Sequence, residues 1–386
     1  ADHSQSNTNP GYANFDWVTN ENATDNTVKV KTLYGIYFGD IGDVSYTASI
    51  GRRASTNGTL ANLRSDDAEA SPNGHMINVE FDGASFNFNL DKVTGVPGMA
   101  FKLCMGRGLT NAEPRFAQTS AGVNMAYFND KTKNTHIDMF GFIFTPYDDG
   151  QYRLTTQAFK AWNLIGFKYN NPANPMLGYE GMSFVPDYSG TNADGILRDT
   201  SGNPIMTSGP AFRNVGDMYG FTVSAIATGI GNGWSDFLDN TTAFASWSMS
   251  KTDPKPGDRM LGSTDNKVGT SWWVGLQMPA VVTKDGKIGL EYNQGSKYWR
   301  SFTYGEDTMV GSKLAARGKA YEAYYTQPIL GKTLSAQLRY TKINYDYTGS
   351  NAFFADDGMP IDINDAMAVN ATKSASNLMG YLRYRY

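Results

Sequence analysis

Basic side chains recur at every second position of strand-like stretches near both ends of the chain. They are Lys29, Lys31, Arg53, Arg339, Arg383 and Arg385. A β-strand turns successive side chains to opposite faces, so residues two apart share a face. Cations on the inner face of a membrane barrel influence which ions its pore passes. If the strands close into a barrel, the two ends of the chain become neighbours, and these six residues line one wall of the pore.

An acidic counterpart lies in the long irregular stretch 170–217. This stretch carries Glu180, Asp187, Asp194 and Asp199. A basic wall that faces an acidic loop would produce a transverse field across a constriction. The alternative is that all these charges are scattered and solvated in the lumen, and the residue pattern leaves both interpretations open.

Catalytic chemistry has little support in the local sequence. His136 and Asp138 are two apart and share a strand face. A hydrolase would also need a positioned nucleophile such as Ser, or a second acid, and none is supplied nearby. Cys104, the only cysteine, has no His signature beside it. We therefore expect that the chain is not an enzyme and has no catalytic residues.

One acidic stretch near the C-terminus has the composition of a cation site. It contains Asp356, Asp357, Asp362, Asn364 and Asp365, and such oxygen ligands suit Ca²⁺. The spacing does not fit an EF-hand, and a solvated acidic loop explains the residues more simply. No CxxCH haem motif is present. We expect no metal and no cofactor.

Short amphipathic strands must position these residues, and about 15 of them follow residue 27. The alternation puts Leu338 and Trp247 on the lipid face, and Arg339 and Ser248 on the lumen face. The expected strands include Thr27–Phe38, Ser120–Phe128, and a hairpin of His75–Asp82 and Ala84–Leu90 around the pair Asp82-Gly83.

The lengths of the connections alternate along the chain. Long connections are expected at 346–375, 294–317, 251–269 and 170–217, all on one side of the sheet. Short ones are expected at 327–331, 279–286, 230–241 and 145–151, on the other side. This asymmetry is typical of outer-membrane barrels, which have short periplasmic turns and longer outer loops.

The last strand is the clearest of the series. In Ser376–Tyr386, SNLMGYLRYRY, the residues Leu378, Leu382, Tyr384 and Tyr386 share one face and the arginines share the other. An amphipathic C-terminal strand that ends on an aromatic residue resembles the assembly signal of bacterial outer-membrane barrels. We expect these four residues to serve as that signal.

Composition agrees with a barrel and excludes other classes. Of 386 residues, 13% are aromatic, including 23 Tyr and 7 Trp, yet the mean hydropathy is −0.43. Alternating lipid-facing and water-facing residues cancel in such an average. No run approaches the ~18 apolar residues of a membrane helix. The net charge of −4 and the lack of basic runs give no sign of nucleic-acid binding.

We therefore predict an all-β fold, a transmembrane antiparallel up-and-down β-barrel of about 16 strands. It forms a single domain over residues 1–386, with a soluble all-β protein as the alternative. An odd strand number is unusual for a bacterial barrel. Residues 1–26 are therefore expected to be a leading segment or to supply an extra strand at Tyr12–Val18, unless N-terminal sequence is missing and the barrel is larger.

Four stretches carry a resemblance to a known family. They are GRRASTNG at Gly51–Gly58, INVEFDGASFNF at Ile77–Phe88, KLCMGRG at Lys102–Gly108 and GSNAFFADDGMPIDIN at Gly349–Asn364. From about residue 27 onward, the chain resembles a family of porin-like outer-membrane proteins catalogued as a domain of unknown function. The resemblance implies a porin-like barrel in a Gram-negative outer membrane, and it supplies no catalytic residues and no particular substrate.

Two functions are weighed against each other, besides an outer-membrane enzyme. The first is a porin or channel for diffusion of small hydrophilic solutes or ions. The second is a barrel that serves as a sheath or scaffold for a partner protein in electron transfer or secretion. In either case the partners are outer-membrane lipid and, during biogenesis, the barrel-assembly machinery. A homo-oligomer is compatible with both functions, and no nucleic-acid partner is expected.

Overall fold

The structure is a computed structural model, and it describes most of the chain. The described residues are 32–55, 57–108, 136–169, 171, 173, 182–186, 198–203, 206–210, 213–303, 311–331, 333–369 and 371–385.

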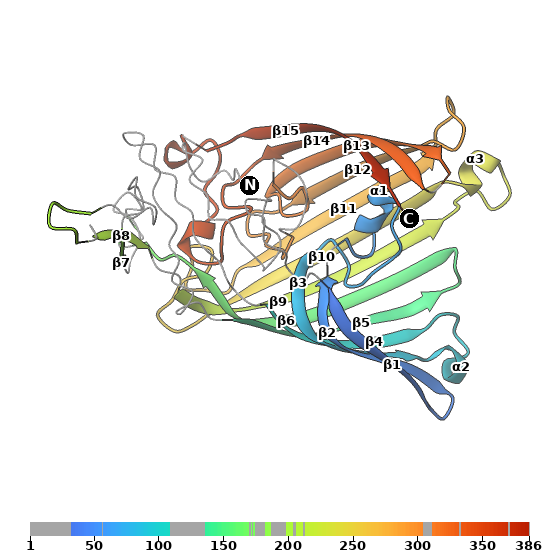
Figure 1. Ribbon diagram of the computed structural model, residues 1–386, viewed down its shortest axis with the longest axis horizontal. Coiled ribbons are helices and arrows are strands. Elements are labelled where there is room, and N and C mark those ends of the chain that lie inside the picture. Colours follow the sequence, from blue (N-terminus) through green and yellow to red (C-terminus); the bar gives the residue numbers. More distant parts are fainter. Residues whose placement is uncertain are drawn as a thin grey trace.

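A single curved antiparallel sheet of 13 strands dominates the fold, and its strands pair in the order of the chain (Figure 1). β9 follows β6 directly, because β7 and β8 pair only with each other. The strands of the large sheet are β1 Leu33–Ile41, β2 Val44–Ser55, β3 Val79–Asn89, β4 Ala100–Gly108, β5 Ile137–Asp148, β6 Tyr152–Gly166, β9 Arg213–Thr228, β10 Thr242–Pro254, β11 Val268–Pro279, β12 Lys287–Gly295, β13 Gly318–Leu330, β14 Leu334–Tyr345 and β15 Ser374–Tyr384.

The remaining elements are short and lie in the connections. β7 Met182–Pro186 and β8 Met206–Pro210 form a separate hairpin-like pair within the stretch 170–217. The helices are α1 Ala61–Ser65, α2 Asp91–Thr94 and α3 Asp236–Asp239, with 3-10 turns η3 Asp356–Gly358 and η4 Ala366–Ala368. Among the described residues, no helix is long and apolar enough to cross a membrane.

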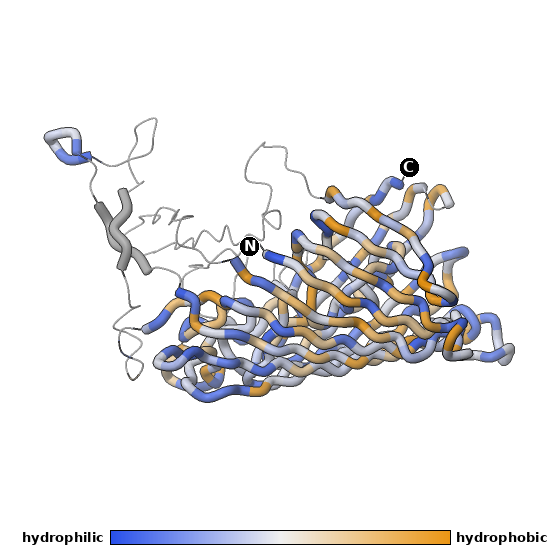
Figure 2. The backbone as a smooth tube through the Cα atoms, turned by 90° about the horizontal axis from the view of Figure 1, so that it is seen from below, coloured by the Kyte–Doolittle hydropathy of each residue, from blue (hydrophilic) through white to orange (hydrophobic). Residues whose placement is uncertain are grey.

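Hydrophobic and hydrophilic residues alternate along many strands of the sheet (Figure 2), and successive side chains of a strand point to opposite faces. In β15, Leu378, Leu382 and Tyr384 are 68%, 71% and 67% exposed on the convex side. The inward neighbours Arg383 and Arg385 contact chain segments that lie on the concave side, which we call the lumen. The amphipathic alternation expected for the last strand is therefore confirmed through Arg385, and Tyr386 lies outside the described residues.

The convex face is apolar and aromatic, whereas the lumen face is polar. Trp247 packs against Phe221 and Trp272 on the convex side, with ring centroids 6.2 and 6.3 Å apart. The next residue, Ser248, is fully buried on the lumen side. Leu338 and Arg339 divide in the same way, so the assignment of these four residues to faces is correct. This inside-out polarity places apolar surface where lipid would lie.

The connections follow the expected asymmetry in part. The turns after β5, β11 and β13 are short and lie at one end of the sheet, at the right of Figure 1. The connections after β6, β12 and β14 are long and lie at the other end. The connections 229–241 after β9, at the first end, and 255–267 after β10, at the second end, are equal in length. We call these two ends the short-turn end and the long-loop end.

The expected hairpin at Asp82-Gly83 is wrong, because β3 runs without a break through both residues. Gly83 lies opposite Gly106 of β4. A Cβ atom on Gly83 would lie 2.0 Å from the carbonyl oxygen of Met105. The glycine therefore marks a close approach of two backbones instead of a turn, the other common use of Gly in strands.

Over the described residues, an open sheet of 13 strands replaces the expected closed barrel of about 16. The hairpin at Asp82-Gly83 is one strand, and β4 pairs directly with β5. The expected strand Ser120–Phe128 lies between those two, outside the described residues. Within the described part of the chain, β1 and β15 are the two ends of the strand order and do not pair with each other.

Lys29 and Lys31 on the pore wall imply that the odd-numbered residues of the first strand face the lumen, and for β1 this phase is wrong. Tyr34, Ile36 and Phe38 lie opposite Gly51, Ser49 and Thr47 of β2, so they face the lumen. Tyr37 points to the convex side, where its ring lies 6.1 Å from that of Tyr46. Both faces of β1 carry aromatic residues, and the hydrophobic pattern alone therefore specifies its phase weakly.

The hydrophobic core fills the lumen near the long-loop end. It joins lumen-facing residues of β5, β6 and β9 to residues of the long connections, among them Trp299, Phe302 and Phe354. Such residues are buried by chain segments that fold back into the curve of the sheet. The segment between β2 and β3 is one of these.

Candidate functional site

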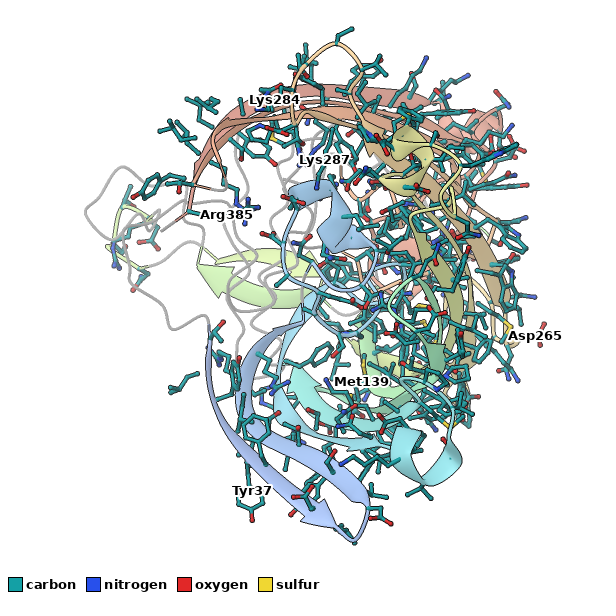
Figure 3. The ribbon with its side chains drawn as sticks, turned by 90° about the vertical axis from the view of Figure 1, so that its right-hand side faces the viewer. Tyr37, Met139, Asp265, Lys284, Lys287 and Arg385 are labelled. Carbon is teal, nitrogen blue, oxygen red and sulfur yellow. The ribbon has the colours of Figure 1, made fainter. Side chains whose placement is uncertain are left out.

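The connection between β2 and β3, residues 57–78, enters the lumen instead of extending away from it. We call it the inserted segment. Figure 3 shows its helix α1 inside the curve of the sheet. Leu60, which precedes α1 with a φ of 73°, is buried against Phe244, Trp273 and Leu314. This apolar anchor explains why a largely polar stretch is not a solvated loop.

Ion pairs hold the inserted segment to the wall at the short-turn end. Asp67 pairs with Arg383 and Arg385 of β15 and its C-terminal extension. Arg385 also donates to the carbonyl oxygen of Ser65 at 2.6 Å. Two further pairs join Asp66 to Lys287, at 2.8 Å, and Glu69 to Arg153. The acidic residues of the inserted segment thus form ion pairs with basic residues of β6, β12 and the β15 end.

His75 belongs to the inserted segment, and its ring lies in the lumen against the wall formed by β10 and β11. Its Nδ1 is 2.9 Å from Ser246 Oγ and 3.0 Å from Ser248 Oγ. Its Nε2 is 2.9 Å from Ser271 Oγ. Burial without a carboxylate partner lowers the pKa of His75 to about 3, so the ring is neutral at ordinary pH.

A buried charge cluster lies beside His75 on the wall formed by β12 and β13. Lys313 Nζ lies 2.6 Å from Glu291 Oε2 and 2.6 Å from Glu322 Oε1. Arg64 of the inserted segment approaches Glu322 at 3.3 Å. Trp273 Nε1 donates to Glu291 at 2.8 Å. The inserted segment and the connection between β12 and β13, residues 296–317, therefore share one pair of wall carboxylates.

The acidic stretch near the C-terminus serves to join loops at the long-loop end, contrary to the interpretation as a solvated loop. Asp356 is buried and bound by Arg259, with Nε to Oδ1 at 2.8 Å. Asp357 accepts the backbone N–H groups of Phe167 and Phe353 at 3.0 and 2.7 Å. Burial raises the pKa of Asp357 to about 6. Among the described residues, no group of three or more His, Cys, Asp or Glu could hold a metal ion.

The structure brings together only part of the predicted basic wall. Arg339 is buried on the lumen side and donates to Gln337 Oε1 at 2.7 Å, and Arg383 and Arg385 lie farther along the same wall. Arg53 belongs to β2, near the other end of the open sheet, where its guanidinium stacks 4.5 Å from the Tyr34 ring centroid. Lys29 and Lys31 lie outside the described residues.

The acidic residues expected to oppose the basic wall are described only in part. Asp199 is exposed, and in the described part of the chain its carboxylate accepts hydrogen bonds from Ser201 and Asn203 of its own turn. Glu180, Asp187 and Asp194 lie outside the described residues. The carboxylates that face Arg383 and Arg385 come from the inserted segment. The only sequence signal for this was the acidic cluster Asp66, Asp67 and Glu69 in a loop flanked by two family-like stretches.

The solved structures that match the chain include an outer-membrane protein of Vibrio cholerae. A loop-deletion mutant of OmpT matches with a TM-score of 0.39 and 11% identity over 88% of this chain and 75% of that chain. OmpT expressed in the outer membrane matches with a TM-score of 0.38 and 11% identity over 88% and 76% of the two chains. No curated protein matches the chain at significant similarity.

The expectation that the chain is not an enzyme is withdrawn, because its sequence ground fails. That ground was the lack of a Ser near a His along the chain. The fold brings three Ser hydroxyl groups to His75 from β10 and β11, more than 170 positions away. A local motif search therefore does not exclude catalysis here.

A family model described as "Protein of unknown function (DUF3373)" matches residues 1–386. This match confirms the resemblance of the four quoted stretches to a family catalogued as a domain of unknown function. The chain belongs to this family of proteins of unknown function.

Proposed function

We propose that this protein is a bacterial outer-membrane channel for small hydrophilic solutes or ions, narrowed by its inserted segment. The observation that carries the proposal is the ionic contact between that segment and the wall. Asp66, Asp67 and Glu69 face Lys287, Arg153, Arg383 and Arg385 across the short-turn end. Charges of opposite sign in a narrow, poorly screened lumen act strongly on passing ions.

The polarity of the sheet supports a membrane channel over a soluble sandwich. Apolar side chains of the convex face, such as Leu290 and Leu378, are 47% and 68% exposed, while lumen-facing Ser, Thr, Asn and Glu are buried. A soluble sandwich would reverse this arrangement. Lipid is the solvent that matches an apolar outside and a polar inside.

Single-channel recording in planar bilayers tests the proposal. We compare the wild type with a triple variant, Asp66→Asn, Asp67→Asn and Glu69→Gln. This variant removes the carboxylates and leaves the wall bases uncompensated, so conductance should rise and the reversal potential in a salt gradient should shift toward anion preference. The matched control neutralises Asp236, Asp265 and Asp285, which are exposed outside the lumen, and should behave as the wild type.

A second set of substitutions should have the opposite sign. Replacing Arg339, Arg383 and Arg385 with Gln removes wall cations and should shift the reversal potential toward cation preference. If correctly folded wild type and both variants fail to conduct, the channel proposal is wrong. A sheath or scaffold for a partner protein would then be the better hypothesis.

A further inference from the structure

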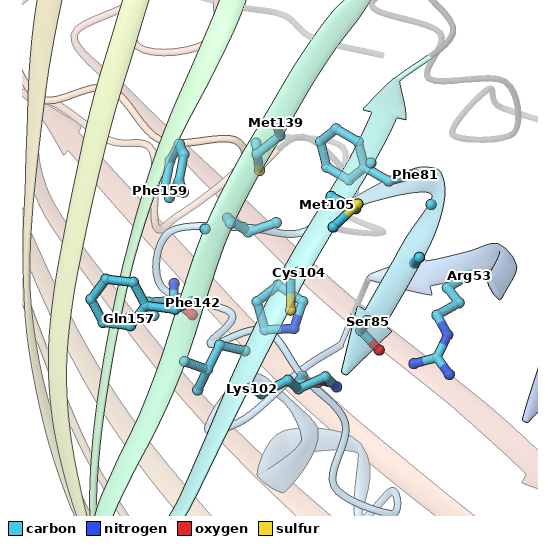
Figure 4. Close-up of a pocket in the computed structure, with 18 of the residues that line it drawn as sticks. Arg53, Phe81, Ser85, Lys102, Cys104, Met105, Met139, Phe142, Gln157 and Phe159 are labelled. Carbon is cyan, nitrogen blue, oxygen red and sulfur yellow. Dashed lines mark hydrogen bonds between the residues drawn. The ribbon is translucent and has the colours of Figure 1, made fainter. Parts of the chain in front are cut away.

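A cavity of about 100 Å³ lies in the lumen wall formed by β2 to β6, apart from the ionic contacts of the short-turn end (Figure 4). Its walls are mainly apolar and include Phe81, Met139 and Phe159, and Ile77 of the inserted segment lies against them. Such a space is somewhat smaller than the ~150 Å³ cavity that holds benzene in an engineered protein. The cavity therefore suits a small molecule with an apolar body.

Glycines of three neighbouring strands leave the cavity floor without side chains. Gly51, Gly83 and Gly106 lie directly opposite one another across β2, β3 and β4. All three face the cavity, and each comes from one of the family-like stretches. A Cβ on Gly51 would lie 2.3 Å from the carbonyl oxygen of Leu33. Close backbone approach thus requires these glycines and keeps the floor open.

The charged groups at the cavity are both cationic. Arg53 and Lys102 line it, and its lining includes no Asp or Glu. Lys102 Nζ lies 2.6 Å from Ser71 Oγ, and the described contacts of Arg53 include the Tyr34 ring but no carboxylate. Other lumen cations, such as Lys313 and Arg383, meet carboxylates. A bound anion would therefore balance the positive charge of these two side chains.

A buried donor provides an independent sign of a ligand. Gln157 lines the cavity and is 2% exposed. Its Oε1 accepts the backbone N–H of Asn73 at 2.9 Å, but its Nε2 has no hydrogen-bond partner in the described part of the chain. Arg53 Nε is also buried and also has no hydrogen-bond partner in the described part of the chain. Buried donors of this kind are costly unless something accepts from them.

We propose that this cavity binds a small carboxylate with a short apolar body, which enters from the lumen. The carboxylate accepts hydrogen bonds from Lys102, Arg53 and Gln157, and the apolar body packs against Phe81, Met139 and Phe159. An inorganic anion would leave the apolar walls unused, and a neutral apolar molecule would leave the cations uncompensated. The site does not require that the barrel conducts.

Calorimetric titration of the full chain in nonionic detergent, with hexanoate as the probe, tests this site. Hexanoate should bind saturably to the wild type. Lys102→Met should weaken binding roughly tenfold or more, the size expected for the loss of one charge-assisted hydrogen bond. Arg53→Met provides a second variant in case Lys102→Met does not fold. Lys287→Met, which removes a lysine at the short-turn end, should bind as the wild type does.

Hexanol separates recognition of the carboxylate from simple burial of the chain. It has the same length and no charge, so it should bind much more weakly than hexanoate. The proposal is overturned by three outcomes: no saturable hexanoate binding to the wild type, equal binding of hexanol and hexanoate, or equal loss in Lys287→Met and Lys102→Met.

Discussion

Glu291 and Glu322 lie directly opposite each other across β12 and β13, and one lysine, Lys313, contacts both within 2.6 Å. Like charges at directly paired positions destabilise a sheet. Here both carboxylates are buried, so the repulsion would be poorly screened without the ammonium group between them. The lysine belongs to the connection between β12 and β13. Its ion pairs with Glu291 and Glu322 therefore hold this connection inside the lumen.

Removing the shared lysine should be among the most damaging single changes. Lys313→Met leaves two buried carboxylates facing each other, and losing one partner of a buried pair costs about 3–5 kcal/mol. We expect a loss of this size in the free energy of unfolding, measured by urea titration in lipid vesicles. Lys319→Met, at an exposed position of β13, should change it by less than about 0.5 kcal/mol.

A double variant shows whether repulsion is the cause. Glu322 keeps Arg64 and Thr341 as partners when Lys313 is absent. Adding Glu291→Gln to Lys313→Met should therefore recover part of the lost stability. A double variant that is less stable than Lys313→Met would show that packing, and not like-charge repulsion, sets the cost.

The sheet could be predicted from the sequence because its signals are local. In β15, exposed Leu378 and Leu382 alternate with inward Tyr381 and Arg383, and any reading of period 2 finds them. Connection lengths follow from the strand positions. The pair Asp82-Gly83 misled because the same two residues suit a tight turn or a close strand approach, and only the neighbouring β4 decides between them.

The lumen could not be predicted because its contacts are distant in sequence. Arg64 meets Glu322 across 258 positions, and Arg385 meets Asp67 across 318. No periodicity encodes such pairs. The inserted segment therefore had the composition of a solvated loop, and its acidic residues were not expected to face the basic wall.

The two faces of the sheet should respond differently to a new charge. Leu338→Arg places a cation on the convex face of β14, where lipid contact near the midplane costs about 2–4 kcal/mol. Asn377→Arg places the same side chain on the lumen face of β15, at a half-buried position, and should cost much less. Unfolding in lipid vesicles measures both. Equal losses would show that the convex face does not meet lipid.

The apolar face of the last strand should direct assembly. Leu382→Asp puts a charge among Leu378, Leu382 and Tyr384, which are exposed on the convex side. We expect reduced insertion into the outer membrane with unchanged synthesis, measured as heat-modifiable protein in membrane fractions. Asn377→Asp introduces the same side chain on the opposite face and should insert normally. Normal insertion of the Leu382→Asp variant would show that this face does not direct assembly.

The buried ring of His75 should make stability depend on pH. Its folded pKa of about 3 lies below the pKa of 6.5 of a solvent-exposed histidine, so the unfolded chain binds the extra proton between these values. The stability contribution is complete above pH 6.5 and is lost as pH falls toward 3, with a limiting slope of about 1.4 kcal/mol per pH unit. His75→Gln keeps polar contacts without a titrating ring, so its unfolding free energy should fall less steeply across this window. Parallel pH curves for wild type and His75→Gln would show that the ring does not titrate on unfolding.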